Sequence, residues 1–357
     1  MKIAVLFDGA SALGKSPDLL ILATVEAVES VLAAEGNQVV RIPISLDGRW
    51  VERIRRGKFD LAFNLCEGID GVAALEPSVI SALEVLGVPF TGASSWTTSL
   101  CLRKHVVNGV LDRAHLPIPR YGVVRRQSRL RLPTVGFPAI CKPAAEDASI
   151  GVEQRSVVRT QKALADRVNA MLEGFPEVLV QRYVAGREVN VGIIGDVALP
   201  VAEIEFDALP KGMWPIVSYR SKWDAGSDED EGTRPRCPAD LPPSIAQELQ
   251  RIALAAWHEV GGSGYGRVDM RIDRAGRPWI LEVNSNPDIA PDAGLARMAQ
   301  AADLDYGALV RAVCEAALLC RAAAVDGAER WARAQRLSGV AVVGDPAVLD
   351  LFAAARR

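Results

Sequence analysis

The first hundred residues alternate between segments that favour strands and segments that favour helices. An apolar run over 2–7 has the composition of a buried strand, and residues 19–34 carry apolar side chains at helical spacing before a second strand-like run over 38–44. A strand, a helix and a strand follow in the same order at 59–65, 78–87 and 88–92. This alternation predicts a parallel sheet with helices on its faces, and therefore an α/β domain.

The middle of the chain lacks that alternation. Residues 103–114 are predicted as a helix, and two prolines within 116–119 mark a boundary after it. Short strand-like runs follow at 121–125, 137–143 and 177–184. Together they predict a small α+β unit.

The C-terminal half is predicted to contain hairpins and one long helix. In chain order the predicted elements are strands over 188–195 and 197–206, a helix over 244–261, and strands over 264–273 and 277–284. Gly195-Asp196 is a two-residue turn between the first two strands. Prolines and charges make 207–243 a predicted long loop, with the acidic run 228–231 as its solvated tip.

A chain of 357 residues exceeds one typical domain of about 150 residues, so we expect several packed units. The predicted division is an N-terminal α/β domain, a central α+β domain, a C-terminal α+β domain and an extension, over residues 1–102, 103–184, 185–325 and 326–357. Packing or dimerisation is the simplest role for the extension.

Charge and cysteine content exclude several classes of protein. The chain has 41 basic and 44 acidic residues, which gives no general attraction to nucleic acid or to an anionic membrane. Its six cysteines form no CxxC pair and only three histidines accompany them, so neither a zinc site nor a disulfide scaffold is indicated. With no signal peptide and no membrane-spanning run, we expect a cytoplasmic protein with reduced thiols.

One segment near the N-terminus matches a phosphate-binding motif. Residues 9–16 fit the spacing GxxxxGK[ST] between a strand and a helix. Pro17 at the start of the helix and the lack of a partner strand for the metal count against a working P-loop. The alternatives are a P-loop phosphotransferase that uses Lys15 and Ser16, or a simple turn or substrate loop.

A second constellation lies on the last two predicted strands. Because side chains alternate along a strand, Arg267 and Asp269 share one face, and so do Glu282 and Asn284. Asp269, Glu282 and Asn284 offer the hard oxygen ligands that Mg²⁺ uses when it is shared with nucleotide phosphates. The alternative is an exposed hairpin face that carries charges.

Other residues are consistent with a nucleotide site. Lys142 ends an apolar strand, where a lysine is rare unless an anion such as phosphate partners it. The small residues of 144–151 suit a lid over a triphosphate. Gln181 and Glu188 flank a strand end and a glycine turn, which fits an adenine and ribose hinge.

These motifs together resemble the ATP-grasp superfamily and, within it, the D-alanine-D-alanine ligase family. The matching segments, in order over about residues 1–321, are FNLCEG with a following DG, LGVPFTG, LRKH, CKPAAEDASIG, VLVQRYVAGRE, YGRVDMRID and ILEVNSNP. The resemblance implies an ATP-grasp fold with an N-terminal α/β substrate domain, a central lid domain and a metal-binding C-terminal domain. It also implies that a substrate carboxylate attacks the γ-phosphate of ATP to give an acylphosphate, from which an amine displaces phosphate.

The resemblance assigns roles to individual residues. Lys104 and Lys142 would bind phosphate, and Glu188 would hold the ribose, while the adenine would be lined by Gln181, Tyr183 and Val184. Two Mg²⁺, or Mn²⁺ in their place, would be ligated by Asp269, Glu282 and Asn284.

Further roles concern the reaction and the substrates. Arg267 would stabilise the acylphosphate and the tetrahedral intermediate, and Ser149 would act from the lid. Substrate contacts would come from Glu67, Lys222, Trp223 and Asp288. The partners are small carboxylate and amine molecules, and a homodimer is usual in the family.

The amino-acid half of the site departs from the family pattern. At five positions where the family has a different, polar side chain, this chain has Leu13, Cys66, Ala148, Trp223 and Ala293. Loss of several polar contacts at about 1–3 kcal/mol each would change substrate choice, so we expect a substrate other than, or in addition to, D-alanine. A non-catalytic ATP-binding module is the alternative from another class.

Three of these residues have simpler explanations. Trp223 could only pack a loop, and Cys66 could be a small buried apolar residue. Lys104, on an amphipathic helix, could be an ordinary surface residue.

Overall fold

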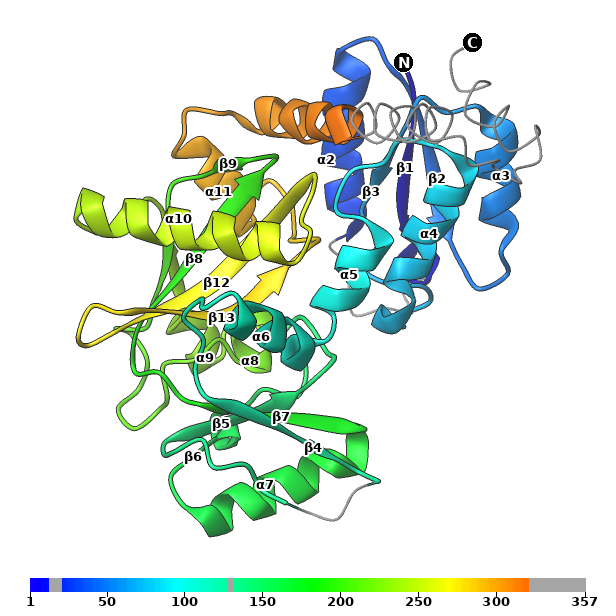
Figure 1. The fold of residues 1–357 in the computed structure, drawn as a ribbon. Coiled ribbons are helices and arrows are strands. Elements are labelled where there is room, and N and C mark those ends of the chain that lie inside the picture. Colours follow the sequence, from blue (N-terminus) through cyan, green and yellow to red (C-terminus); the bar gives the residue numbers. More distant parts are fainter. Residues whose placement is uncertain (13–20, 128–130, 321–357) are drawn as a thin grey trace, which may run out of the picture.

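The computed structural model describes residues 1–12, 21–127 and 131–320, which form three sheets with their helices (Figure 1). The C-terminal sheet lies between the N-terminal domain and the central domain in this view. The segment that holds Leu13, Lys15, Ser16 and Pro17, and the extension 326–357, lie outside the described residues. Within the described part, no helix is long and apolar enough to cross a membrane.

The N-terminal domain confirms the predicted parallel sheet. Its strands have the order β2-β1-β3, with both pairings parallel. Their bounds are β1 (Lys2–Asp8), β2 (Gln38–Ile44) and β3 (Leu61–Asn64). The helices are α1 (Gly9–Ala12), α2 (Ile21–Ala34), α3 (Arg49–Gly57), η1 (Ala73–Leu75), α4 (Glu76–Leu86) and α5 (Ser95–Cys101). The strand predicted over 88–92 is reduced to a single bridge between Ala62 and Phe90.

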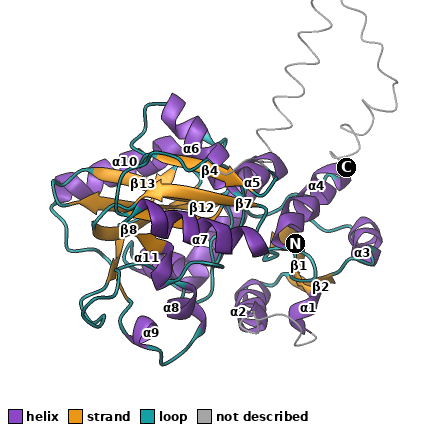
Figure 2. Ribbon diagram, turned by 90° about the horizontal axis from the view of Figure 1, so that it is seen from below, coloured by secondary structure: helices purple, strands orange, loops and turns teal. Residues whose placement is uncertain are grey.

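The alternation along β1 explains why helices cover both faces of this sheet. Ile3 and Val5 pack in a core cluster with α2, whereas Ala4 and Leu6 pack in another cluster with α3 and α4. Figure 2 shows α2 and α4 on opposite sides of β1 and β2. A strand buried on both faces reads as a continuous apolar run, which is the pattern that predicted it.

The central domain is a four-stranded antiparallel sheet with one long helix. Its strand order is β4-β7-β5-β6. The elements are β4 (Tyr121–Arg125), β5 (Ala139–Pro143), η2 (Gln154–Ser156), β6 (Val157–Val158), α7 (Gln161–Gly174) and β7 (Glu177–Arg182). Thr160 caps α7 by accepting a hydrogen bond from the backbone of Ala163 at 3.2 Å, and Leu164 and Val168 of α7 pack on the sheet.

The C-terminal domain is built on a larger antiparallel sheet of order β11-β10-β8-β12-β13, with β9 beside β8. Its strands are β8 (Gly186–Ile194), β9 (Val197–Ala198), β10 (Ala202–Glu205), β11 (Arg234–Arg236), β12 (Tyr265–Asp273) and β13 (Pro278–Asn284). The helices are α6 (Lys104–Arg113), α8 (Tyr219–Trp223), α9 (Asp228–Glu231), α10 (Pro243–Glu259) and α11 (Gly294–Gln300). Val107 and Leu111 of α6 share a core cluster with α10, so this helix packs on the C-terminal sheet.

The connection to the N-terminal domain runs through a second core cluster. Leu295 and Met298 of α11, with Leu309 and Val313 from a helical stretch over 306–320, pack in the same cluster as α2. The N-terminal and C-terminal domains therefore share part of one apolar core.

The prediction of a long loop over 207–243 was wrong. This segment contains α8, α9 and β11. Ser218 caps α8 and Ser227 caps α9, each hydroxyl accepting a hydrogen bond from a backbone N–H three residues later. Such serine caps stabilise very short helices that have no apolar periodicity to reveal them.

The acidic run within this segment is also not a solvated tip. Glu229 is only 5% exposed, and its Oε2 accepts hydrogen bonds from Ser218 Oγ at 2.5 Å and Gln154 Nε2 at 3.1 Å. This carboxylate therefore joins the segment to the central domain.

Candidate active site

Four polar side chains meet where β12 and β13 pair. Arg267 lies opposite Asn284, and Asp269 lies opposite Glu282. The guanidinium of Arg267 donates two hydrogen bonds to Asp269, at 2.7 and 2.9 Å. The structure thus brings together the four residues that the strand pattern had placed on shared faces.

The ion pair between Arg267 and Asp269 is partly buried, and each member stabilises the charged form of the other. Burial acts to raise the pKa of Asp269, but Arg267 more than offsets this and the pKa lies below its ordinary value. Asn190 on β8 donates a further hydrogen bond of 2.7 Å to Asp269. Asp269 is therefore held as a carboxylate in a fixed orientation.

Lys104 is not a surface residue, because it is only 6% exposed at the first turn of α6. Its ammonium lies 2.5 Å from Asp147 Oδ1 and 3.5 Å from Glu282 Oε1. Burial opposes its charge, but Glu282 and Asp147 raise its pKa above the ordinary lysine value. Glu282, by contrast, has a pKa raised by burial, against the effect of Lys104.

Lys142 on β5 is the second lysine of the site. No carboxylate of the described residues lies within ion-pair distance of its ammonium. Burial lowers the pKa of Lys142, while Glu282, Glu188 and Asp269 act in the opposite direction from farther away. A partly buried ammonium without a close anionic partner fits a site for phosphate oxygens.

Gln181 on β7 pairs in register with Ile140 of β5 and is 1% exposed. Its Nε2 has no hydrogen-bond partner among the residues that the structure describes. Buried donors without partners are rare, so this amide fits an acceptor on a bound ligand.

The predicted hinge residues Tyr183, Val184 and Glu188 are held by one residue that the sequence analysis missed. Arg271 on β12 is 3% exposed and donates hydrogen bonds to the Tyr183 hydroxyl, the Val184 carbonyl and the Glu188 carboxylate. Because side chains alternate along a strand, Arg271 lies on the same face of β12 as Arg267 and Asp269. A third charged residue on that face was the feature of the sequence that could have identified Arg271 as part of the site.

Two loops close against each other beside this site. We name residues 144–151 the lid loop and residues 215–223, which include α8, the substrate loop, after the roles that the sequence predicts for them. Ser149 Oγ donates to the Val217 carbonyl at 3.1 Å, and Trp223 Nε1 donates to the Ala148 carbonyl at 3.0 Å. Trp223 therefore does more than pack its own loop, since it bonds to the lid.

Lys222 is exposed on the substrate loop, but its charge reaches the site. Burial acts to raise the pKa of Asp147, yet Lys104 and, more weakly, Lys222 hold it below its ordinary value. The lid carboxylate therefore faces cations from two different elements.

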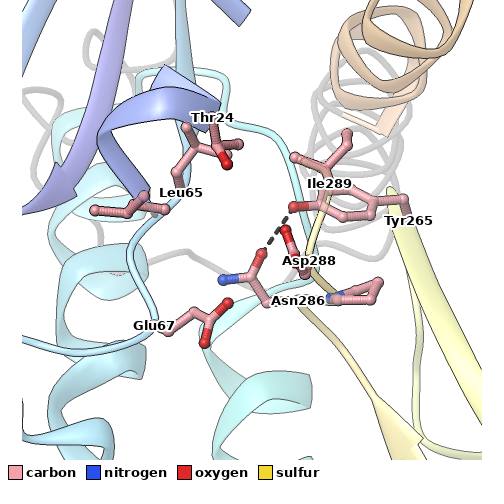
Figure 3. Close-up of a pocket in the computed structure, with 9 residues that line it drawn as sticks. Thr24, Leu65, Glu67, Tyr265, Asn286, Asp288 and Ile289 are labelled. Carbon is pink, nitrogen blue, oxygen red and sulfur yellow. Dashed lines mark hydrogen bonds between the residues drawn. The ribbon is translucent and has the colours of Figure 1, made fainter. Parts of the chain in front are cut away.

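A small pocket lies between the N-terminal and C-terminal domains (Figure 3). Its volume is about 10 Å³, and the predicted substrate residues Glu67 and Asp288 both line it. Ile21, Thr24, Leu65, Tyr265, Asn286, Pro287 and Ile289 complete the lining. Room for about one water means that a substrate would need the pocket to open.

Asn286 joins the two sides of this pocket and was also missed. It accepts a hydrogen bond from Tyr265 Oη at 2.8 Å and donates to the Cys66 carbonyl at 3.0 Å and to Glu76 Oε1 at 3.1 Å. Its backbone N–H donates to Asn284 Oδ1 at 2.9 Å, which links the pocket to the strand pair.

The thiol of Cys66 and the carboxyl of Glu76, two residues that Asn286 contacts, both have raised pKa values and therefore keep their protons to higher pH. Cys66 is fully buried, and burial raises the pKa of its thiol, as expected of a small core residue. Glu76 also has a pKa raised by burial, with Glu67 and Asp147 adding to the effect.

Lys142 on the antiparallel sheet of the central domain lies near Glu282, Glu188 and Asp269 on the antiparallel sheet of the C-terminal domain. Together with the N-terminal α/β domain, these two sheets make up the ATP-grasp fold. A family model described as "D-ala D-ala ligase C-terminus" matches residues 110–315. The chain belongs to the D-alanine-D-alanine ligase family.

Relatives and solved structures agree with this placement. The chain is 31% identical to a D-alanine–D-alanine ligase of Methylobacterium radiotolerans, over 89% of this chain and 99% of that protein. It is 33% identical to one of Alkalilimnicola ehrlichii, over 70% of this chain and 76% of that protein. The crystal structure of the Bacillus anthracis enzyme complexed with ATP has the same fold, with a TM-score of 0.73 at 22% identity over 90% of this chain and 98% of that one.

Proposed function

We propose that this protein joins the carboxylate of an amino acid or a related acid to an amine through an acylphosphate, with release of ADP and phosphate. Its family makes it an ATP-dependent ligase that forms a carbon–nitrogen bond, with ATP and Mg²⁺ as cofactors. The observation that carries the proposal is Lys142, a partly buried ammonium near Glu282, Glu188 and Asp269 that has no close counterion in the described part of the chain.

The nucleotide would be held between the two antiparallel sheets. In this proposal Lys142 and Lys104 bind phosphate oxygens and Glu188 holds the ribose. The adenine is lined by Gln181, Tyr183 and Val184, of which Gln181 supplies an unpartnered buried donor. Phosphate would replace Asp147 as the partner of Lys104, since both are anions.

The metal ligands proposed are Asp269, Glu282 and Asn284, two carboxylates and an amide. Among the described residues, no three side chains of His, Cys, Asp or Glu are grouped for metal binding. The two carboxylates and one amide of the proposed set suit Mg²⁺, which in nucleotide sites takes one or two carboxylates and completes its shell with phosphates and water. When bound, the metal offsets negative charge on the transferring phosphoryl group.

The chain's own groups would do the remaining work. Arg267, oriented by its two hydrogen bonds to Asp269, is placed to stabilise negative charge on the acylphosphate and the tetrahedral intermediate. Contacts of Ser149 and Trp223 between the lid loop and the substrate loop would exclude water from a reactive intermediate. Glu67 and Asp288 would attract a substrate ammonium to the pocket between the domains, and Lys222, whose charge acts on Asp147 and Asp269, would bind a substrate carboxylate.

The substrate is proposed to include an acid or amine other than, or in addition to, D-alanine. We expect purified protein with Mg²⁺-ATP to release ADP with at least one pair of amino acids besides D-alanine with itself, with the product identified by mass. Turnover of D-alanine alone would show that the changes at Leu13, Cys66 and Trp223 are tolerated and that this proposal is wrong. ATP binding without ADP release from any pair would instead favour a non-catalytic module.

We expect nucleotide affinity to fall as the pH rises through the pKa of Lys142. Burial lowers that pKa below the ordinary 10.5, and only the protonated ammonium attracts phosphate. Calorimetric titration with ADP from about pH 7 to about pH 10 measures the effect. Lys142→Arg, which stays charged, should flatten the alkaline loss; equal curves for the two proteins would contradict the role of Lys142.

The organisation of the whole molecule also belongs to the proposal. We propose substrate binding in residues 1–102, the lid in 103–184 except for α6, which packs on the C-terminal sheet, and metal binding in 185–325, in a cytoplasmic enzyme with access to ATP. A homodimer is proposed from the family resemblance. Light scattering on the 38.3 kDa chain distinguishes it from a monomer.

A further inference from the structure

Arg271 is the most extensively bonded cation of the C-terminal sheet that the mechanism above does not use. Its Nε and Nη2 both donate to Glu188 Oε2, at 3.1 and 2.6 Å. Its Nη1 donates to the Tyr183 hydroxyl at 2.9 Å and to the Val184 carbonyl at 2.8 Å. Its Nη2 also donates to the Pro215 carbonyl of the substrate loop.

These hydrogen bonds involve only one of the two carboxylate oxygens of Glu188. Oε2 takes both hydrogen bonds from Arg271, whereas Oε1 has no partner among the residues the structure describes. A carboxylate held through one oxygen keeps its other oxygen in a fixed position to accept hydrogen bonds from hydroxyl groups.

The backbone of the hinge is held by the same guanidinium. The Val184 carbonyl is bonded to Arg271, and two residues later Gly186 pairs with Asp273 at the end of β12. A Cβ at Gly186 would lie 1.9 Å from the Ile272 carbonyl oxygen, so only glycine allows the hinge to cross β12 this closely. The hydrogen bond from Arg271 to the Val184 carbonyl therefore holds the hinge against β12, the strand that also carries Asp269.

Aromatic rings extend this contact toward the central domain. Arg271 lies 4.9 Å from the ring centre of Tyr183, whose ring packs edge-on against Trp214 at 5.1 Å. Arg159 lies 4.6 Å from the ring centre of Trp214. Cation–π and aromatic contacts thus connect β12 and the hinge to the segments that hold Trp214 and Arg159.

We propose that Arg271 is a positioning residue for the nucleotide: it orients Glu188 toward the ribose hydroxyls and fixes the hinge that faces the adenine. This inference rests on the proposed function, because it assumes that ATP occupies the hinge. It assigns to Arg271 a role in selecting ribonucleotides, which a merely structural cation would not have.

The test compares ATP with 2′-deoxy-ATP and 3′-deoxy-ATP in the wild type and in Arg271→Met. We expect the wild type to favour ATP by about tenfold or more in kcat/KM over at least one deoxynucleotide, since a hydroxyl bonded to a carboxylate is lost. In Arg271→Met this preference should fall to about twofold or less, with KM for ATP raised about tenfold and kcat changed much less. Glu188→Gln should lose the same preference, and the double variant should lose no more than either single variant.

The matched control is Arg277→Met, which removes an arginine that is also paired with a carboxylate, Asp273, but is exposed. It should keep the wild-type preference. If Arg271→Met does not fold, the same comparison is made with Arg271→Lys. Lysine keeps the positive charge but lacks the guanidinium group, whose separate N–H donors reach both Glu188 and Val184. A variant at Arg271 that folds and keeps the full ribose preference would overturn the inference, whereas a wild type that does not bind ATP would overturn the proposed function itself.

Discussion

Lys142→Ala is expected to abolish ATP use, with a fall in kcat of at least about 10³-fold, the scale of a cation that acts on a transferring phosphoryl group. Lys142 is partly buried near Glu282, Glu188 and Asp269 and has no close counterion among the residues that the structure describes, so its charge is available to phosphate. Removing it should leave those carboxylates to repel the nucleotide. The measurement is ADP release at saturating Mg²⁺-ATP, with ADP affinity measured separately by calorimetry.

Two further variants make this result decisive. Lys162→Ala removes an exposed lysine of the same domain that pairs with Asp166, and it should keep wild-type activity. Lys15→Ala tests the P-loop alternative, which the sequence motif over 9–16 left open. Loss of ATP use in Lys15→Ala with activity retained in Lys142→Ala would reverse the assignment and favour the phosphotransferase.

Arg267→Lys is expected to lower kcat by roughly 10²- to 10³-fold, the usual cost of losing one donor that stabilises charge in a transition state. Lysine keeps the positive charge, but it cannot make the two hydrogen bonds that orient the side chain against Asp269. KM for ATP should change little, because the proposed phosphate contacts are made by Lys104 and Lys142. Steady-state kinetics with a productive substrate pair measures both constants.

Arg251→Lys is the matched control for this variant. Arg251 also donates two hydrogen bonds to one carboxylate, that of Glu248, but on the exposed face of α10. Its replacement should leave kcat unchanged. A kcat within about threefold of the wild type in Arg267→Lys would show that Arg267 does not act on the reacting groups.

The pairing of β12 with β13 shows which parts of a site a sequence can predict. A strand alternates its side chains, and a short turn fixes the register of the strands that it joins. Arg267 and Asp269 therefore had to face Asn284 and Glu282 once the hairpin formed. Local patterns of this kind also predicted the parallel sheet of the N-terminal domain and the strands that carry Lys142 and Gln181.

Other contacts join elements that are far apart in the chain, and no local sequence pattern predicts them. Asn286 reaches Cys66 and Glu76 across more than 200 residues, and Glu229 is buried because Gln154 and Ser218 meet it there. The acidic run around Glu229 has the composition of a solvated turn, so its burial could only follow from tertiary contacts.

Outside 88–92 and 207–243, the sequence alone determined the order of most strands and helices, and it determined the hairpin that sets Arg267 and Asp269 opposite Asn284 and Glu282, and the family. These depend on spacing within a few residues or on the order of motifs. Only the tertiary structure decided that Lys104 is buried against Asp147 and Glu282, and that Arg271 organises the hinge. Whether a charged residue is exposed or buried depends on which distant segments pack over it, and that is a property of the fold as a whole.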